Sequence, residues 1–260
     1  ARVICLSQRT QPDGQYHSHR GGTTGAKVTL SNVKINASGA AVSVSGNVEL
    51  IIAGTNTNTL RSGPKHAGVE KADDNGTLTI SGFGTLNASG GESGAGIGGA
   101  WHKNASNIVI EVDIEANGGN WGAGIGGGQS AAGQNITIRD GNVTAIPGGE
   151  AAGIGGGFQG DGKNITIESG TVYAESGGGN GPVAAIGGGR VSGKGENIQI
   201  TGGNVTVKSG TGVWIGGTNG EISKDSLTGA VTYVNQNGNV ENTANWDITV
   251  NETAVNGVNY

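Results

Sequence analysis

Apolar and polar residues alternate in short runs along most of the chain, and the runs recur in a fixed order. Each unit begins with such a run. In the first unit it is Val-Thr-Leu at 28–30, and comparable runs begin the later units at 48–50, 78–80, 108–110, 136–138, 165–167 and 198–200. After a Gly, Asn or Asp turn a second run follows, most clearly at 33–35, 143–145, 172–174 and 205–207. Period-two alternation places successive side chains on opposite faces of a strand. Each run therefore predicts a half-buried β-strand.

A third, glycine-rich run completes each unit. One larger apolar residue stands among Gly and Ala in each of these runs, at spacings of 27 to 32 residues: Val42, Val69, Ile97, Ile125, Ile154, Ile186 and Ile215. Three short strands without a helix cannot bury an apolar face alone, so such units have to stack on one another. The sequence predicts an all-β parallel β-helix of about seven coils over 27–220, with three short strands in each coil.

Four asparagines stand at the same place in successive units, directly before the first run: Asn107, Asn135, Asn164 and Asn197. Stacked coils bring equivalent side chains to one side of the solenoid, where amide groups hydrogen-bond along the stack. We therefore expect an asparagine ladder.

The two ends of the chain depart from the repeat. An open end of a β-helix is an unpaired strand edge that has to be covered. Residues 1–26 are therefore expected to form an N-terminal cap, and residues 221–260 a C-terminal cap or a small β appendage.

Composition and charge exclude several classes of partner. Gly makes up 55 of the 260 residues, Met is absent, and the formal net charge is −5 without a cluster of Lys and Arg. Nucleic acids attract clustered basic residues, so we expect no nucleic-acid partner. No apolar run reaches the roughly 18 residues of a membrane-spanning helix, which predicts no membrane span. The lone cysteine, Cys5, excludes an intramolecular disulfide.

The glycine-rich strand is the first candidate surface. With its Ile directed to the core, the flanking Gly and Ala would leave the outer face bare, and glycine often marks the close approach of a ligand. We expect a smooth glycine-lined face. The alternative is that the small residues only relieve crowding at a tight bend.

Large planar side chains gather in the loops beside this predicted face: Trp101, His102, Trp121, Phe158, Arg190 and Trp214. Planar rings present a flat apolar surface on which a sugar face can stack, while Arg and His supply hydrogen bonds. These residues are the predicted binding site for a polysaccharide or other glycan. The competing interpretation is that the rings pack on loops to cover a thin core.

Acidic residues form a second candidate site near one corner of the predicted coils: Glu111, Asp113, Glu115, Asp140 and Glu168. Neighbouring carboxylates can act as acid and base, or can bind calcium through oxygen ligands. These five are the candidate catalytic residues, and solvated surface charge is the alternative.

Other metal candidates are weaker. Asp73 and Asp74 lie in the acidic turn Lys-Ala-Asp-Asp-Asn-Gly at 71–76, which is a candidate calcium site or an ordinary exposed Asx turn. His17 and His19 form a sparse pair without further His or Cys nearby. We expect no cofactor, or calcium.

The stretches "VTLSNVKINASGAAVSVSGNVELIIAG" at 28–54 and "GTLTISGFGTLNASGG" at 76–91 carry a family resemblance. They look like the start of the carbohydrate-binding β-helix domains of secreted clostridial and other gut or soil bacterial proteins, and the likeness covers about 27–217. The resemblance implies a right-handed solenoid, similar to pectate lyases in shape. It also implies an extracellular or bacterial cell-surface location and a plant polysaccharide ligand, with a role for calcium.

Three classes of function follow. The first is a non-catalytic polysaccharide-binding module that uses the glycine-lined face and its aromatic loops. The second is a β-helix glycoside hydrolase or polysaccharide lyase that uses the carboxylates. The third is a structural stalk or an ice-binding solenoid, the latter suggested by a file of outward threonines at Thr29, Thr79, Thr137 and Thr166.

Overall fold

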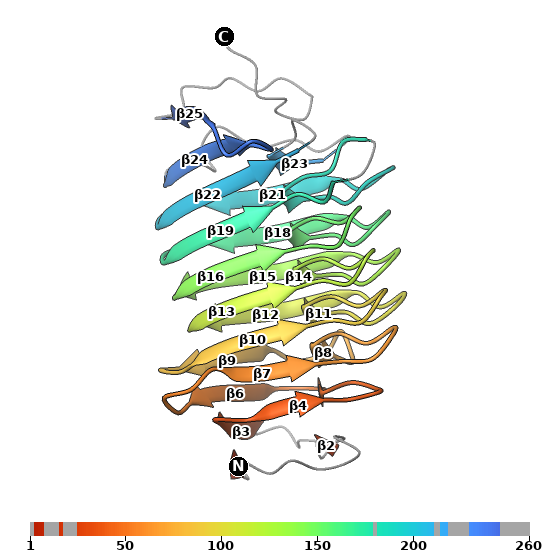
Figure 1. Cartoon of the computed structure of the whole chain (residues 1–260), viewed down its shortest axis with the longest axis vertical. Coiled ribbons are helices and arrows are strands. Elements are labelled where there is room, and N and C mark those ends of the chain that lie inside the picture. The colour runs from red at the N-terminus through yellow and green to blue at the C-terminus, as the bar shows by residue number, and fades with distance from the viewer. Residues whose placement is uncertain are drawn as a thin grey trace.

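The chain folds as a right-handed parallel β-helix, which confirms the predicted fold class. The computed structural model describes residues 25–178, 181–210, 214–217 and 229–240, together with the backbone of 3–7, 16–17 and 241–244. Figure 1 shows the coils stacked along one long axis, with the strands of successive coils side by side. Seven sets of three consecutive strands, from β3–β5 to β21–β23, form the coils of the described part.

Each coil gives one strand to each of three sheets. The first sheet contains β1 (Val3–Ser7), β3 (Ala26–Ser31), β6 (Val48–Ala53), β9 (Leu78–Gly82), β12 (Ala105–Glu111), β15 (Gly133–Asp140), β18 (Gly162–Ile167) and β21 (Gly195–Ile200). The second sheet contains β4 (Lys34–Asn36), β7 (Asn58–Arg61), β10 (Thr85–Ser89), β13 (Asp113–Asn117), β16 (Asn142–Ile146), β19 (Thr171–Glu175), β22 (Asn204–Ser209), β24 (Ala230–Asn235) and β25 (Val240–Ala244). The third sheet contains β2 (Tyr16–His17), β5 (Val42–Val44), β8 (Val69–Lys71), β11 (Ile97–Gly98), β14 (Ile125–Gly126), β17 (Ile154–Gly155), β20 (Ile186–Gly187) and β23 (Ile215–Gly216). Pairing is parallel throughout except between β24 and β25.

The core is a set of apolar columns that run through the coils. In the third sheet each predicted apolar residue is the strand partner of the next, from Val42 opposite Val69 to Ile186 opposite Ile215. None of the seven is more than 6% exposed. The alignment of the repeat on these residues is therefore confirmed position by position.

The first coil is shifted by two residues from the register that the sequence predicts. Val28 pairs with Leu50, and Leu30 pairs with Ile52. Lys27 consequently lies opposite Glu49, and their ion pair measures 2.5 Å. Thr29 pairs with Ile51, so it lies outside the file that contains Thr79, Thr137 and Thr166. The burial of Ile52 explains the shift, because the longer apolar run of β6 places Leu50 and Ile52 inside.

The asparagine ladder is present. The side-chain amide of Asn135 donates to Asn107 Oδ1 at 3.0 Å, Asn164 donates to Asn135 at 2.9 Å, and Asn197 donates to Asn164 at 2.8 Å. All four residues adopt a left-handed backbone, with φ between 51° and 58°. Asparagine tolerates this conformation better than most residues do, which explains why the ladder occurs at a local break in the strand pairing.

The predicted caps fall largely outside the described residues. At the N-terminal end β1 and β2 pair with β3 and β5 of the first coil. At the C-terminal end β24 pairs with β22 and carries β25 on its other edge. Residues 1–2, 8–15, 18–24, 179–180, 211–213, 218–228 and 245–260 are not described, and neither are the side chains of Cys5 and His17. The predicted caps and the pair His17 and His19 therefore stay predictions.

Within the described ranges there is no helix that is long and apolar enough to cross a membrane.

Candidate functional site

On each side of the short third-sheet strands the chain makes a tight turn, and these turns project from one edge of the solenoid (Figure 1). The first column consists of the four-residue turns 63–66, 91–94, 119–122 and 148–151. The second column consists of 100–103, 128–131, 157–160 and the longer turn 189–193. The four-residue turns are closed by a hydrogen bond from the last N–H to the first carbonyl, as from Gly122 to Gly119 at 2.9 Å. We call the two columns together the turn ridge.

Close packing of the turns explains the glycines. A Cβ atom on Gly119 would overlap the carbonyl oxygen of Gly91 in the preceding coil. The backbone of these turns also bonds to the preceding coil. The Gly119 N–H, for example, donates to the carbonyl oxygen of Gly94 at 2.9 Å. Side chains larger than hydrogen would separate the coils.

The predicted smooth glycine-lined face is therefore wrong. Residues 93–99, 122–128, 151–157 and 183–189 are all buried. The turns on both sides fold over the short strands and cover their outer face. The alternative interpretation, that the small residues relieve crowding, describes these glycines correctly.

The two columns of the turn ridge are joined by backbone hydrogen bonds at four levels. The N–H groups of Trp101, Gln129 and Phe158 donate at 2.9 Å, and that of Arg190 donates at 3.1 Å. Their acceptors are the carbonyl oxygens of Lys65, Ser93, Trp121 and Glu150, in the same order. The ridge is consequently a hydrogen-bonded crest that belongs to the same rigid framework as the sheets.

At two of these levels the side chains of the two hydrogen-bonded residues also contact each other. Lys65 Nζ lies 4.3 Å from the ring centroid of Trp101, and Arg190 forms an ion pair with Glu150. The ring of His102 lies 4.4 Å from that of Trp101, tilted by 42°. Trp101 keeps 39% of its surface exposed.

Five of the six residues predicted to bind a ligand meet on the ridge: Trp101, His102, Trp121, Phe158 and Arg190. Sequence reasoning missed Lys65 and Glu150, which stand two residues after the Gly of a turn and pair with the predicted residues. The two turns that contain them, Gly-Pro-Lys-His and Gly-Gly-Glu-Ala, carry the Gly and Pro signals of a tight turn.

Trp214 is a core residue, so its predicted role in ligand binding is wrong. It is 3% exposed, its Nε1 donates to the Val234 carbonyl at 3.1 Å, and its ring meets that of Tyr233 edge to face at 5.7 Å. Burial in this place raises the pKa of the Tyr233 phenol above its usual value. Trp214 and Tyr233 close the core at the C-terminal end of the described coils.

The predicted carboxylates are divided between two places. Glu111, Asp113 and Asp140 line a depression of about 310 Å³ at the corner between the first and second sheets. Glu168 is linked to the same corner, because Arg139 contacts Glu111 at 3.2 Å and Glu168 at 3.4 Å.

Glu115 lies apart from this corner. It faces outward from β13 and accepts hydrogen bonds from Asn87 and Asn117, both at 3.1 Å. The alternation that grouped it with Glu111 and Asp113 ignored the bend of the chain between β12 and β13.

Hydrogen bonds hold two of the corner carboxylates. Asp113 Oδ1 accepts from the Asn142 backbone at 2.7 Å and from its side chain at 3.0 Å. Asp140 Oδ1 accepts from the Gly141 backbone at 2.8 Å. Phe83 also lines the depression and is 82% exposed, a feature that the sequence analysis did not identify.

The acidic turn at 71–76 is organised by protein groups. Lys71 is buried and its ammonium donates to Asp73 Oδ1 at 2.5 Å, while Asp74 Oδ1 accepts from the Ser106 hydroxyl at 2.9 Å. Among the residues that the structure describes, no group of three or more His, Cys, Asp or Glu side chains is placed to hold a metal ion. The calcium sites stay predictions.

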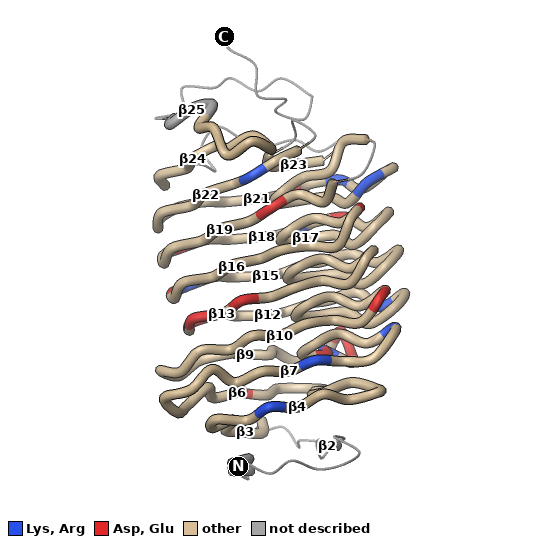
Figure 2. The backbone as a smooth tube through the Cα atoms, viewed as in Figure 1, with Lys and Arg blue, Asp and Glu red and all other residues tan. Residues whose placement is uncertain are grey.

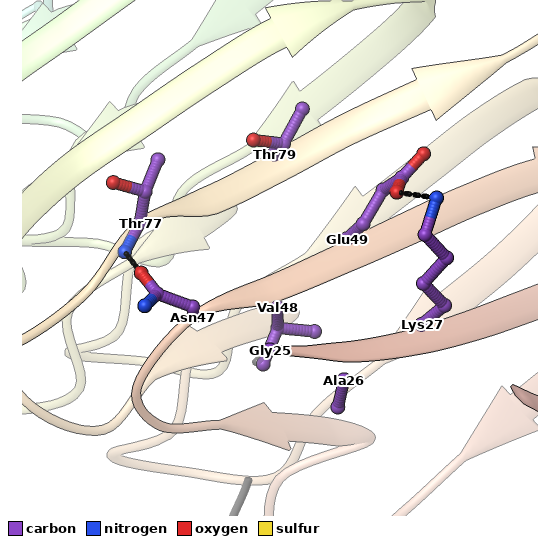
Figure 3. Close-up of a pocket in the computed structure, with 8 residues that line it drawn as sticks. All are labelled: Gly25, Ala26, Lys27, Asn47, Val48, Glu49, Thr77 and Thr79. Atoms are coloured by element: carbon purple, nitrogen blue, oxygen red, sulfur yellow. Dashed lines mark hydrogen bonds and ion pairs between the residues drawn. The ribbon is translucent and has the colours of Figure 1, made fainter. Parts of the chain in front are cut away.

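A further depression, of about 260 Å³, lies on the first sheet (Figure 3). Its lining includes the ion pair of Lys27 with Glu49 and the hydrogen bond from Thr77 N to Asn47 Oδ1. It contains none of the predicted site residues. Figure 2 shows the charged positions scattered over the described coils.

The chain is similar to known β-helix repeats. Comparison with protein families matches residues 78–101, 113–129, 136–158 and 165–190 to the beta helix repeat. The comparisons with curated proteins and with solved structures gave no match. The matched segments cover part of coils three to six and end at the second residue of the second-column turns, which is Trp101, Gln129, Phe158 or Arg190.

Proposed function

We propose that the protein is a non-catalytic glycan-binding module and that its ligand lies on the turn ridge. The observation that carries this proposal is Trp101, a large ring left 39% exposed on a hydrogen-bonded crest. The core is thin and the chain has four Trp, so an indole that served only for packing would be expected inside, as Trp214 is. A flat apolar ring beside polar groups is typical of sites that bind sugars.

The surroundings of Trp101 suit such a ligand. Lys65 and His102 lie against its ring and offer N–H donors to sugar hydroxyls. Phe158 and Arg190 continue the same crest two and three coils further on. A polysaccharide is the class of glycan that would span several coils, and an extracellular or bacterial cell-surface location follows for such a ligand.

The test is a glycan array with plant, microbial and mucin glycans, with and without calcium. We expect the wild-type chain to bind one class of polysaccharide and Trp101→Ala to lose at least tenfold in affinity. Phe83→Ala is the comparison variant, because Phe83 is 82% exposed at the other candidate site, and a ligand on the ridge should bind it as it binds the wild type. Equal binding by all three proteins would exclude a ridge site, and silence of the whole array would exclude the binding module and favour a structural stalk.

The second candidate function is a β-helix glycoside hydrolase or polysaccharide lyase. One observation favours it: Glu111, Asp113 and Asp140 line the same depression beside the exposed ring of Phe83. Glycan hydrolysis needs two carboxyl groups in different protonation states on either side of the scissile bond.

The enzyme candidate is tested by recovering the bound ligand and measuring its length. If the corner is catalytic, shortened ligand is released by the wild type and by Glu115→Gln, and is not released by Asp113→Asn or Asp140→Asn. Intact ligand in every sample rejects the enzyme.

A further inference from the structure

Planar side chains form one stripe along the second column of the turn ridge. The second residue of each turn is Trp101, Gln129, Phe158 or Arg190, which supply an indole, an amide, a phenyl and a guanidinium group. Backbone hydrogen bonds join the turns in this order. The N–H groups of His102, Ser130 and Gln159 donate at 3.0, 2.7 and 3.0 Å to the carbonyl oxygens of Gln129, Phe158 and Arg190, respectively. The stripe therefore runs parallel to the solenoid axis.

The four turns also share one backbone feature. The third residue of each has a left-handed φ: 56° at His102, 58° at Ser130, 61° at Gln159 and 84° at Val191. The three four-residue turns, at 100–103, 128–131 and 157–160, match a type II turn, in which the third residue has a positive φ. Equal turns in register direct the Cα–Cβ bonds of Trp101, Gln129 and Phe158 to the same side, and the longer turn with Arg190 continues the column.

The strand spacing sets the period of the stripe. Neighbouring coils lie about 4.8 Å apart, and the aromatic members, Trp101 and Phe158, are two levels apart. Their positions consequently repeat after about 10 Å along the axis. Gln129 and Arg190 supply hydrogen-bonding groups at the intermediate levels.

We propose that the turn ridge binds an extended, linear β-1,4-type glycan that runs along the solenoid axis, with about one sugar per coil. This inference rests on the proposed function and names its ligand class. A glycan in a flat twofold conformation turns the same ring face to one side at every second sugar. Sugars at alternate positions then stack on Trp101 and Phe158, and the sugars between them meet Gln129 and Arg190.

Two of the four groups in the stripe are restrained before the ligand arrives. Arg190 is held by its ion pair with Glu150, and Trp101 by Lys65. Groups that are already ordered lose little conformational freedom on binding. A flexible or helically coiled α-1,4 glycan cannot keep its sugar faces aligned with this stripe, so the ridge discriminates between linkage types.

The experiment is a calorimetric titration with oligosaccharides of two to six sugars. The probes are β-1,4-linked oligomers of glucose, xylose, mannose and N-acetylglucosamine, and α-1,4-linked glucose oligomers of equal lengths. For at least one β-1,4 series we expect affinity to rise about tenfold between two and four sugars, as the second ring becomes reachable. The α-1,4 series shows no such step.

Two variants show which ring causes the rise in affinity between two and four sugars. Phe158→Ala abolishes the rise between two and four sugars and leaves the affinity for the disaccharide unchanged, whereas Trp101→Ala weakens binding at every length. Gln159→Asn is the matched control in the same turn, since Asn suits a left-handed φ, and it keeps the step.

The outcomes separate the two proposals. Absence of any glycan binding overturns the proposed function and this inference with it. Binding that Trp101→Ala removes, but that is independent of chain length or equal for α and β linkages, keeps the ridge site and overturns the axial arrangement. A Phe158→Ala effect of equal size at every length overturns it as well.

Discussion

The ammonium of Lys65 lies 4.3 Å from the centroid of the Trp101 ring, and the Trp101 N–H donates to the Lys65 carbonyl at 2.9 Å. The two residues belong to different coils and to different columns of the turn ridge. Side-chain pairing thus follows backbone pairing across the columns, and the ion pair of Glu150 with Arg190 repeats this relation at the fourth level. The crest is held at both ends by charged side chains.

This relation predicts a measurable coupling between Lys65 and Trp101. Cation–π contacts at exposed sites contribute about 0.5–1 kcal/mol. A double-mutant cycle with Lys65→Met and Trp101→Leu, measured by urea unfolding, is expected to give a coupling energy in this range. The same cycle with Lys103→Met, which changes an exposed lysine in the turn of Trp101 itself, is the control and should give none. Equal coupling energies in the two cycles would contradict the pairing.

The close stacking of turns predicts that glycine is obligatory at position 119. In Gly119→Ala the new Cβ overlaps the Gly91 carbonyl, so the coils have to separate, at a cost of about 3 kcal/mol. Gly178→Ala is the control, because a Cβ there meets no atom within 4 Å. The free energy of unfolding should fall in the first variant and stay within about 0.5 kcal/mol of wild type in the second. A Gly119→Ala protein as stable as the control would show that the ridge accommodates side chains.

The sequence predicts the solenoid well because its signal is repeated. The column from Val42 to Ile215 and the ladder from Asn107 to Asn197 each place the same residue type at the same point of successive coils. Stacking then brings these residues together whatever the details of the turns. Errors in one coil, such as the register of β3 on β6, leave the other coils correctly placed.

The candidate site is less predictable because it depends on how the loops fold. Period-two alternation places Ile125 inside, but it does not reveal that the turns at 119–122 and 128–131 cover the outer face of β14. For the same reason, alternation does not reveal that Phe83 is exposed and that Trp214 is buried. Phe83 follows a glycine at an open corner, and Trp214 directly precedes the third-sheet strand β23. The sequence shows only that both are aromatic.

Buried Lys71 is predicted to stabilise the turn that follows it. Its ammonium donates to Asp73 Oδ1 at 2.5 Å and to the carbonyl oxygens of Asp73 and Asn75 at 2.8 and 2.7 Å. Lys71→Met keeps most of the apolar part of the side chain and removes all three bonds, so we expect a loss of about 2 kcal/mol. Lys34→Met at an exposed position of β4 is the control, with a change below about 0.5 kcal/mol. Equal thermal denaturation curves for both variants would show that Lys71 contributes no net stability.

From the burial of Tyr233 we predict that the protein loses stability at alkaline pH. Burial raises the pKa of its phenol above the usual value of about 10, so the folded state favours the neutral form. The corresponding stability is complete below about pH 10 and is lost as the pH rises toward the folded pKa, by up to about 1.4 kcal/mol per pH unit. Tyr233→Phe has no proton to lose, and its urea midpoint should fall less steeply between pH 10 and 11. Parallel decreases in both proteins would assign the alkaline effect to other groups.

From the backbone conformation of Val191 we predict that a substitution at this position stabilises the fold. Its φ of 84° places a β-branched side chain in the left-handed region, which costs about 1–2 kcal/mol relative to a conformation that the residue prefers. The side chain is 56% exposed, so its removal sacrifices little burial. Val191→Gly is expected to raise the free energy of unfolding by about 1 kcal/mol. Val240→Gly, at a similarly exposed valine of β25, should lower it by a similar amount, because glycine weakens a strand. If both substitutions destabilise the protein, the backbone at Val191 is not strained, and the second-column turns do not require a residue suited to the left-handed region.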